Sequence, residues 1–321
     1  MWRVLPVLLA GAPIARGAES IERLDPALDA IIAPGTRIET LCTGFDWAEG
    51  PVWDPEAGHL LFSDVPRNTI YRWTEGMAEA EVWMKPSGFT GPVSNRREPG
   101  SNGLALDPGG RLVLCEHGDR RVAVLTSDGG KMTVADRHEG KRFNSPNDLA
   151  IRRNGDIYFT DPPYGLPKDA DPELPFCGVY RVTPAREVTL LVRDLERPNG
   201  IAFSPDEKTL YVAVSHRPFL RIMAYPVKDN GTLGHGRVFL DARPLDGPGS
   251  TDGLKVAPDG TVFATGPGGL LVLTPDGKLL GRVLCGRPTA NVAFGPDHRS
   301  LFLTSDDRIL RLALVTPPSE P

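Results

Sequence analysis

The chain has 321 residues, and glycine (35) and proline (32) together fill about a fifth of them, against roughly 12% in average proteins. Because both residues are poor in helix interiors, this composition argues against a helical bundle, and a hydrophobic content of 40% argues against disorder. The net charge of −5 comes without a basic block, so nucleic acid is not expected as a partner.

The first 19 residues are typical of a secretory signal. Arg3 precedes an apolar run over residues 4–15, and small residues follow. We therefore expect a periplasmic or secreted protein, with a cytoplasmic one as the alternative. No other apolar stretch approaches the ~18–20 residues of a membrane helix, so no membrane association is expected beyond this segment.

The four cysteines form neither a CxxC pair nor a zinc pattern; they are Cys42, Cys115, Cys177 and Cys285. Cys115 lies in an apolar, strand-like run and is expected to be a buried free thiol. Export would permit one disulfide, which the sequence does not identify.

Residues 20–35 precede the repeated part of the chain. Their apolar positions 21, 24, 28, 31 and 32 follow a helical spacing that Pro26 interrupts. This pattern predicts a short N-terminal helix or turn.

Six copies of one pattern follow. Each has a short apolar strand, a turn rich in Asp, Pro and Gly, and a second apolar strand, often with a third behind it. The copies begin at Glu49, Asn102, Asn147, Asn199, Asp252 and Ala290. Periods of about 40–50 residues with several strands each are typical of propeller blades. We predict an all-β fold, a six-bladed β-propeller over residues 36–316, with residues 317–321 as a tail; a β-sandwich or β-helix is the alternative.

The strand expected at residues 36–42 has no hairpin partner nearby in the sequence. We expect it to complete the last blade and close the ring, because closure removes an open sheet edge.

Five of the six copies begin with a carboxylate or carboxamide side chain. Equivalent positions on the innermost strands of a propeller converge on its axis, so Glu49, Asn147, Asn199 and Asp252 are expected around one point. Oxygen ligands with two negative charges suit a hard divalent cation. Asn-Gly and Asp-Gly are ordinary turn sequences when taken singly, so the metal hypothesis depends on their shared register.

Five short segments resemble those of the senescence-marker-protein-30/gluconolactonase/luciferin-regenerating family, and most of all its bacterial gluconolactonase branch. They are residues 49–53 (EGPVW), 144–148 (NSPND), 160–165 (TDPPYG), 197–200 (RPNG) and 250–253 (STDG). Each segment alone is weak, but together they are specific, and the resemblance covers roughly residues 38–315. It implies a six-bladed propeller with one divalent cation in the central channel.

By this resemblance, Glu49, Asn199 and Asp252 match metal ligands of the family, and Asn147 matches an Asn that contacts metal or substrate. The implied activity is hydrolysis of a sugar lactone, as in the conversion of D-glucono-1,5-lactone to gluconate. Ca²⁺ is the expected cation, and Mg²⁺, Mn²⁺ and Zn²⁺ are alternatives that can share such ligands.

Lactone hydrolysis needs a polarised carbonyl, an activated water and a ring oxygen that leaves as an alcohol. A divalent cation supplies the first and assists the second, and a carboxylate beside it can accept the proton of the water. We assign this catalytic role to Asp252 in addition to metal binding. The alternative is that Asp252 only holds the metal.

Further residues are expected to contact the substrate. Asn102 begins the second copy of the pattern, His117 follows its second strand, and Tyr164 lies in a Pro-rich loop. His216 and Arg217 lie at the corresponding exit of the fourth copy, where Arg217 would bind a carboxylate or hydroxyl groups of a sugar. For a lone histidine such as His117, a structural role is the alternative. No GxSxG nucleophile elbow is present.

Three other functions remain open. A non-enzymatic scaffold would not need four oxygen ligands in one register. A quinone-dependent sugar dehydrogenase would need basic and histidine side chains over the quinone, whereas the expected channel is acidic and rich in amides. An aryl-ester or organophosphate hydrolase would differ only in its substrate. The sequence leaves the particular lactone and the oligomeric state open.

Overall fold

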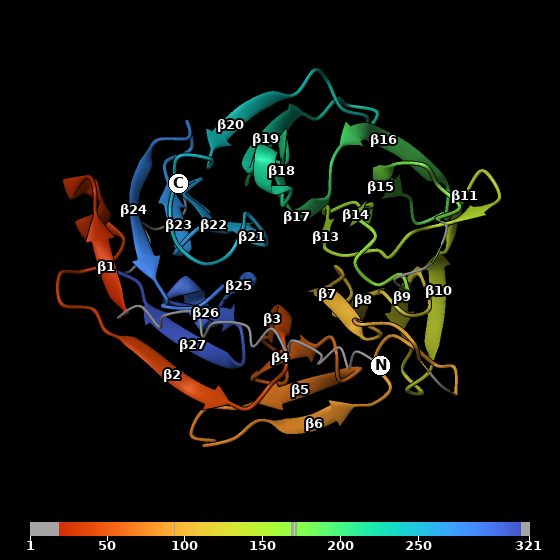
Figure 1. The fold of residues 1–321 in the computed structure, drawn as a ribbon, viewed down its shortest axis with the longest axis horizontal. Coiled ribbons are helices and arrows are strands. Elements are labelled where there is room, and N and C mark those ends of the chain that lie inside the picture. Colours follow the sequence, from red (N-terminus) through yellow and green to blue (C-terminus); the bar gives the residue numbers. More distant parts are fainter. Residues whose placement is uncertain (1–18, 93, 168–169, 171, 316–321) are drawn as a thin grey trace, which may run out of the picture.

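Six small β-sheets surround a central axis (Figure 1). The computed structural model describes residues 19–92, 94–167, 170 and 172–315. The predicted signal segment, apart from its last residue, and the predicted tail lie outside the described residues. The six-bladed propeller predicted from the repeats is confirmed.

Each copy of the sequence pattern forms one blade of antiparallel strands, with its first strand nearest the axis. The first blade has β3 (Ala48–Asp54), β4 (His59–Asp64), β5 (Thr69–Trp73) and β6 (Glu81–Met84). The second has β7 (Ser101–Leu106), β8 (Leu112–Glu116), β9 (Arg121–Leu125) and β10 (Lys131–Ala135). The third has β13 (Leu149–Ile151), β14 (Ile157–Asp161), β15 (Cys177–Val182) and β16 (Val188–Leu195).

The fourth blade has β17 (Pro198–Phe203), β18 (Thr209–Val214), β19 (Arg221–Pro226) and β20 (Arg237–Asp241). The fifth has β21 (Leu254–Val256), β22 (Val262–Gly266), β23 (Gly269–Leu273) and β24 (Leu279–Leu284). The sixth has β25 (Asn291–Phe294), β26 (Ser300–Ser305) and β27 (Arg308–Ala313). A two-residue hairpin, β11 (Arg137–His138) with β12 (Lys141–Arg142), and two 3₁₀ turns, η2 (Arg217–Phe219) and η3 (Pro296–His298), lie in the connections.

The ring closes through a strand from the N-terminal side, as expected. Strand β2 (Ile38–Thr43) pairs antiparallel with β27 and becomes the outermost strand of the sixth blade. The first and last parts of the propeller are thereby held by backbone hydrogen bonds, which satisfy a sheet edge that would otherwise be open.

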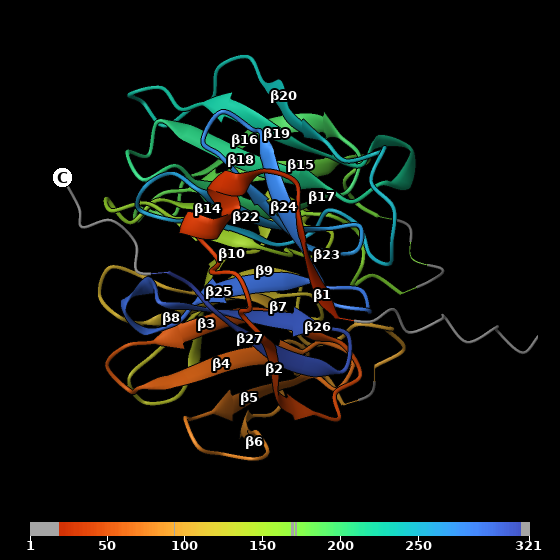
Figure 2. The same ribbon diagram turned by 90° about the vertical axis from the view of Figure 1, so that its left-hand side faces the viewer.

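The segment before β2 contains the short helix expected within residues 20–35, but it also contains a strand that was not expected. Its first residues form strand β1 (Ser20–Arg23), which pairs with β24 as a fifth strand of the fifth blade (Figure 2). A short 3₁₀ helix, η1 (Pro26–Ala30), follows, with the Asp25 carboxylate accepting a hydrogen bond from the Ala27 backbone. The helical spacing has a simpler cause: Leu28 and Ile32 are buried against the fifth blade, whereas Leu24 is 54% exposed.

Nonpolar side chains pack between neighbouring blades around the ring. Phe159 and Tyr180, for example, stack in the cluster between the second and third blades. Trp53 stacks on Phe302 across the junction of the first and sixth blades. Burial of these faces leaves the axis to the polar residues at the start of each inner strand.

The cysteines agree with the expectation of free thiols. Cys115 is fully buried in the cluster between the second and third blades. All four cysteines are free: Cys42, Cys115, Cys177 and Cys285. Within the described ranges, no helix is long and apolar enough to cross a membrane.

Candidate metal centre and active site

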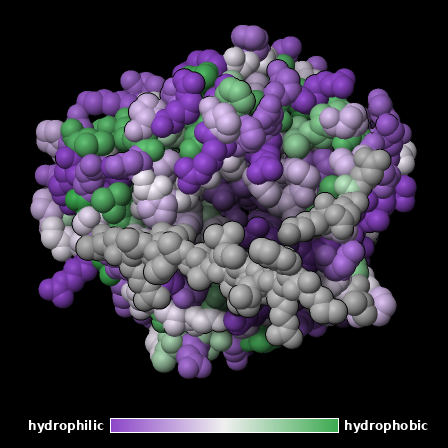
Figure 3. All heavy atoms as spheres, in the orientation of Figure 1, coloured by the Kyte–Doolittle hydropathy of each residue, from purple (hydrophilic) through white to green (hydrophobic). Residues whose placement is uncertain are grey.

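A polar cavity of about 500 Å³ opens at the axis of the propeller. Figure 3 shows the corresponding hollow at the centre of this face, with hydrophilic residues beside it. The predicted residues that line the cavity come from five different blades: Glu49, Asn102, Asn147, Asn199 and Asp252. The topology therefore brings together side chains that are far apart in the sequence, as the shared register predicted.

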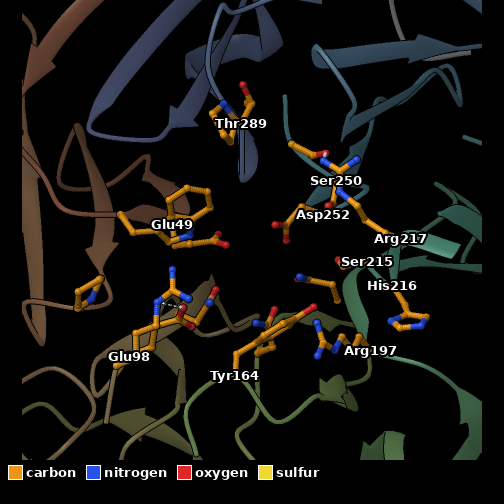
Figure 4. A pocket seen from close by; sticks show the side chains of 18 of the residues that line it. Glu49, Glu98, Tyr164, Arg197, Ser215, His216, Arg217, Ser250, Asp252 and Thr289 are labelled. Atoms are coloured by element: carbon orange, nitrogen blue, oxygen red, sulfur yellow. Dashed lines mark hydrogen bonds and ion pairs between the residues drawn. The ribbon is translucent and has the colours of Figure 1, made fainter. Parts of the chain in front are cut away.

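The two predicted acidic ligands face each other across this cavity (Figure 4). Glu49 is the second residue of β3 and is 2% exposed, and Asp252 lies two residues before β21. Neither carboxylate pairs with a Lys, Arg or His side chain among the described residues. Burial raises the pKa of Glu49, and burial together with the negative charge of Glu49 raises the pKa of Asp252. The pair is thus short of positive charge.

Several oxygen atoms at the centre also lack hydrogen-bond partners among the described residues. Buried oxygens without a partner include Oδ1 of Asn102, Asn147 and Asp252. Unpaired buried oxygens are rare, since each costs about 1–3 kcal/mol. Among the described residues, no group of three or more His, Cys, Asp and Glu side chains forms a metal site. The predicted ligands are instead two carboxylates and two carboxamides, a donor set that fits a hard divalent cation.

A ring of glycines brings the inner strands close together. Four blades carry Gly as the second residue of the repeat, at positions 50, 103, 200 and 253. A Cβ on Gly50, where φ is +51°, would lie 1.9 Å from the backbone oxygen of Asn102. A Cβ on Gly253 would lie 2.0 Å from Cγ of Asn291. These positions leave no room for a side chain.

The remaining two blades carry Asp148 and Asn291 at that second position. Oδ1 of Asn291 accepts a hydrogen bond from the Val292 backbone at 2.8 Å, so its Nδ2 faces the carboxylates. Nδ2 donates to Oε2 of Glu49 at 3.4 Å and to Oδ2 of Asp148 at 3.3 Å. One buried amide therefore bridges two buried carboxylates. Sequence reasoning missed Asn291 because it took Ala290 as the equivalent residue of the sixth copy.

We expect Asn291→Leu to lower the free energy of unfolding by about 1–3 kcal/mol, because both carboxylates lose a buried donor. Urea denaturation with and without a divalent cation measures this effect. The loss should be larger in the cation-free protein, where the Asn291 amide and the Gly50 backbone N–H are the hydrogen-bond donors to Glu49 among the described residues. Unchanged stability in both conditions would contradict the bridging role of Asn291.

His117 lies behind the cavity rather than on its wall. It is fully buried, and its Nε2 is 3.4 Å from Nδ2 of Asn147. Burial lowers the pKa of His117 to about 3, so the imidazole is neutral and its Nε2 accepts a hydrogen bond from the Asn147 amide. This contact leaves Oδ1 of Asn147 free to face the cavity. The geometry favours the alternative raised for this histidine, a structural role.

Glu98 is a cavity residue that the sequence did not indicate. Its Oε2 is 3.7 Å from Nδ1 of His117, on the side of the ring away from Asn147. Burial raises the pKa of Glu98 to about 7. The residue comes from the long connection between β6 and β7, which has no repeat register, and this is why no pattern pointed to it.

Two loops of the third blade contribute to the same wall. The Asp161 carboxylate accepts hydrogen bonds from the backbones of Asn144 and Ser145, each at 2.8 Å, and so holds the segment that presents Asn147. Tyr164 lines the cavity, as predicted, and lies beside Ser215.

Comparison with known proteins agrees with this architecture. The family model of the SMP-30/gluconolactonase/LRE-like region matches residues 47–307 of this chain. A gluconolactonase of Zymomonas mobilis is 37% identical over 310 residues, which cover 92% of this chain and 86% of the relative. A solved gluconolactonase of Xanthomonas campestris has a TM-score of 0.82 at 34% identity, covering 96% of this chain and 99% of that one.

A solved calcium-binding regucalcin of Agrobacterium tumefaciens shares the fold, with a TM-score of 0.71 at 21% identity over 89% of this chain and 97% of its own. The fold and the axial cluster of oxygen-bearing side chains thus define a propeller with a polar central cavity. The chain belongs to the SMP-30/gluconolactonase/LRE-like family.

Proposed function

We propose that this protein is a divalent-metal-dependent hydrolase of sugar lactones, with D-glucono-1,5-lactone as the reference substrate. The observation that carries the proposal is the convergence of Glu49, Asn147, Asn199 and Asp252 on one cavity, with unpaired oxygens on Asn147 and Asp252. The gluconolactonase relatives support the lactone as the substrate class.

The four converging side chains would hold the cation. Ca²⁺ is our first choice, because the all-oxygen set suits it and a structural relative is a calcium-binding protein. When bound, the cation supplies Lewis-acid polarisation of the lactone carbonyl and a lowered pKa of a nearby water. The second choices are Mg²⁺, Mn²⁺ and Zn²⁺.

The chain itself positions the substrate and moves the proton. Asp252 accepts a proton from the attacking water through its unpaired Oδ1. The water oxygen forms the new bond to the carbonyl carbon, and the bond between that carbon and the ring oxygen breaks. The proton then passes to the ring oxygen, which leaves as a hydroxyl group of the product acid. Asn102 and Tyr164 line the space beside this centre, and we assign to them the binding of hydroxyl groups of the sugar.

A lactone panel tests the proposal directly. We expect acid release from D-glucono-1,5-lactone in a pH-indicator assay, loss of that activity on treatment with EDTA, and recovery when Ca²⁺ is added back. Spontaneous hydrolysis is subtracted with a protein-free blank, so that the EDTA-treated protein can be measured against it. If the cation-supplied protein hydrolyses none of the sugar lactones, the proposal is wrong and a non-enzymatic scaffold is favoured. Aryl esters are included in the panel to test the alternative of an aryl-ester hydrolase.

A further inference from the structure

Two arginines line the cavity on the side of the fourth blade. Arg197 lies directly before β17, and Arg217 lies in the connection between β18 and β19, so both come from the same end of one blade. Figure 4 shows them on the side of the cavity where Asp252 and Tyr164 lie. Both side chains are exposed to solvent within this opening.

Neither arginine has a carboxylate partner among the described residues. Arg217 donates only to the backbone oxygen of Gly249, at 3.3 Å. The Arg197 guanidinium lies 5.8 Å from the centre of the Tyr164 ring. Two other charged residues at this opening are already engaged: His216 with Glu196 at 2.9 Å, and Asp46 with Arg67 at 2.7 Å. A third arginine of the cavity lining, Arg97, lies beside Glu98, with its Nε 4.0 Å from Oε1 of that carboxylate.

The charges of the cavity are therefore separated in space. The carboxylates of Glu49 and Asp252 lie at the centre, where a cation would balance them, whereas Arg197 and Arg217 lie on one wall. A guanidinium without an acidic partner at the edge of a concave site is suited to a carboxylate or phosphate, which it binds through paired N–H groups.

Tyr164 lies between the central carboxylates and the two arginines. Its ring carries Arg197 on one side, while its hydroxyl lies beside Ser215 and Asn199, close to Asp252. An anion held by the arginines is thus one aromatic side chain away from the reacting centre. If the carbonyl of a sugar lactone is bound at that centre, a substituent that reaches the arginines must extend away from the carbonyl.

We infer that Arg197 and Arg217 form an anion subsite that favours lactones with a negatively charged substituent remote from the lactone carbonyl. The substituent is a carboxylate or a phosphate, and its source is a sugar acid or a sugar phosphate. This inference rests on the proposed lactone hydrolysis and narrows its substrate class.

Matched substrate pairs test the subsite, because the two members of each pair share one ring and differ in one anionic group. The first pair is 6-phospho-D-glucono-1,5-lactone and D-glucono-1,5-lactone; the second is D-glucaro-1,4-lactone and D-glucono-1,4-lactone. We expect the wild type to have a higher kcat/KM for the charged member of at least one pair. The pair that shows the preference distinguishes phosphate from carboxylate.

The preference is expressed as the ratio of kcat/KM for the charged member of a pair to kcat/KM for the uncharged member. Arg197→Gln and Arg217→Gln should each reduce this ratio by about 5–10-fold, mainly through KM, because each removes a charge-assisted hydrogen bond. Added salt should reduce it in the wild type as well. Arg243→Gln is the matched control, since Arg243 is an exposed arginine outside the cavity that pairs with Asp241. A wild-type ratio at or below one for both pairs would overturn the subsite while leaving lactone hydrolysis standing.

A binding measurement separates the subsite from the activity. Isothermal titration of 6-phosphogluconate and of gluconate, neither of which is turned over, compares a ligand that has the extra anion with one that lacks it. We expect tighter binding of 6-phosphogluconate to the wild type, and loss of the difference in the Arg197→Gln/Arg217→Gln double variant. If no lactone is hydrolysed but 6-phosphogluconate still binds more tightly than gluconate, the proposed function fails and the subsite stands. If both acids bind equally and neither charged lactone is preferred in turnover, the subsite is overturned.

Discussion

Asp252→Asn is expected to reduce kcat for D-glucono-1,5-lactone by about 10²–10⁴-fold while the propeller stays folded. Asn keeps the size of the side chain and an oxygen toward the cavity, but it cannot accept the proton of the attacking water. The measurement is steady-state turnover with Ca²⁺ in excess, together with circular dichroism to verify the fold. Near wild-type turnover would remove Asp252 from the mechanism.

The same variant separates the two roles assigned to Asp252. If it is the general base, kcat should fall far more than the affinity for Ca²⁺, measured by calorimetry. If it is only a ligand, affinity and activity should fall together, and high Ca²⁺ should restore turnover. Asp246→Asn is the matched control, because Asp246 is an exposed aspartate from the connection that precedes Asp252. It should retain both turnover and affinity.

Glu49→Gln is expected to weaken Ca²⁺ binding by about 100-fold or more, because it removes one of the two central negative charges and a buried ligand. Activity at a fixed Ca²⁺ concentration should be lost with it. Calorimetry gives the affinity, and thermal unfolding with and without Ca²⁺ gives an independent readout, since ligand binding raises the stability of the folded state. Glu56→Gln, an exposed glutamate of the same blade, should leave both unchanged.

In the cation-free protein, the raised pKa of Glu49 predicts that Glu49→Gln stabilises the fold at high pH, whereas in the presence of Ca²⁺ the same variant loses the stability that the bound cation provides. A carboxyl group with a raised pKa binds more protons when folded than when unfolded, so stability is lost as pH rises through the folded pKa. We expect the cation-free wild type to unfold at a lower temperature at pH 8 than at pH 5, and Ca²⁺ to stabilise it more at pH 8. Cation-free Glu49→Gln should have the weaker pH dependence. An equal pH dependence in both proteins would contradict the burial of an unpaired charge at Glu49.

The residues that sequence reasoning found and those it missed differ in a definite way. Glu49, Asn147, Asn199 and Asp252 begin copies of one repeated unit, and equal places in a repeat become equal places around an axis. Asn291 was missed because it lies one residue later in its copy, where four other blades need glycine. Its importance depends on a contact with Asp148 from a blade on the other side of the ring.

Glu98 and strand β1 were beyond prediction for another reason. Glu98 belongs to a connection without periodicity, and only the folded chain brings it within 3.7 Å of His117. The apolar spacing before β2 suggested a short helix or turn, which η1 provides, but it did not indicate that the backbone of β1 pairs with the free edge of β24. An available sheet edge offers hydrogen bonds that local propensity cannot anticipate.

The sequence by itself determined the number of blades, the closing strand and the set of carboxylate and amide side chains that line the central cavity. Each of these follows from short-range patterns, apolar strands and Gly/Pro turns, that recur with one period. Only the tertiary structure decided which polar groups meet: the amide of Asn291 between two carboxylates, His117 behind Asn147, and Arg197 on the face of Tyr164. The physical reason is that the charge balance of a buried site depends on side chains from several blades at once, and no local pattern records their distances.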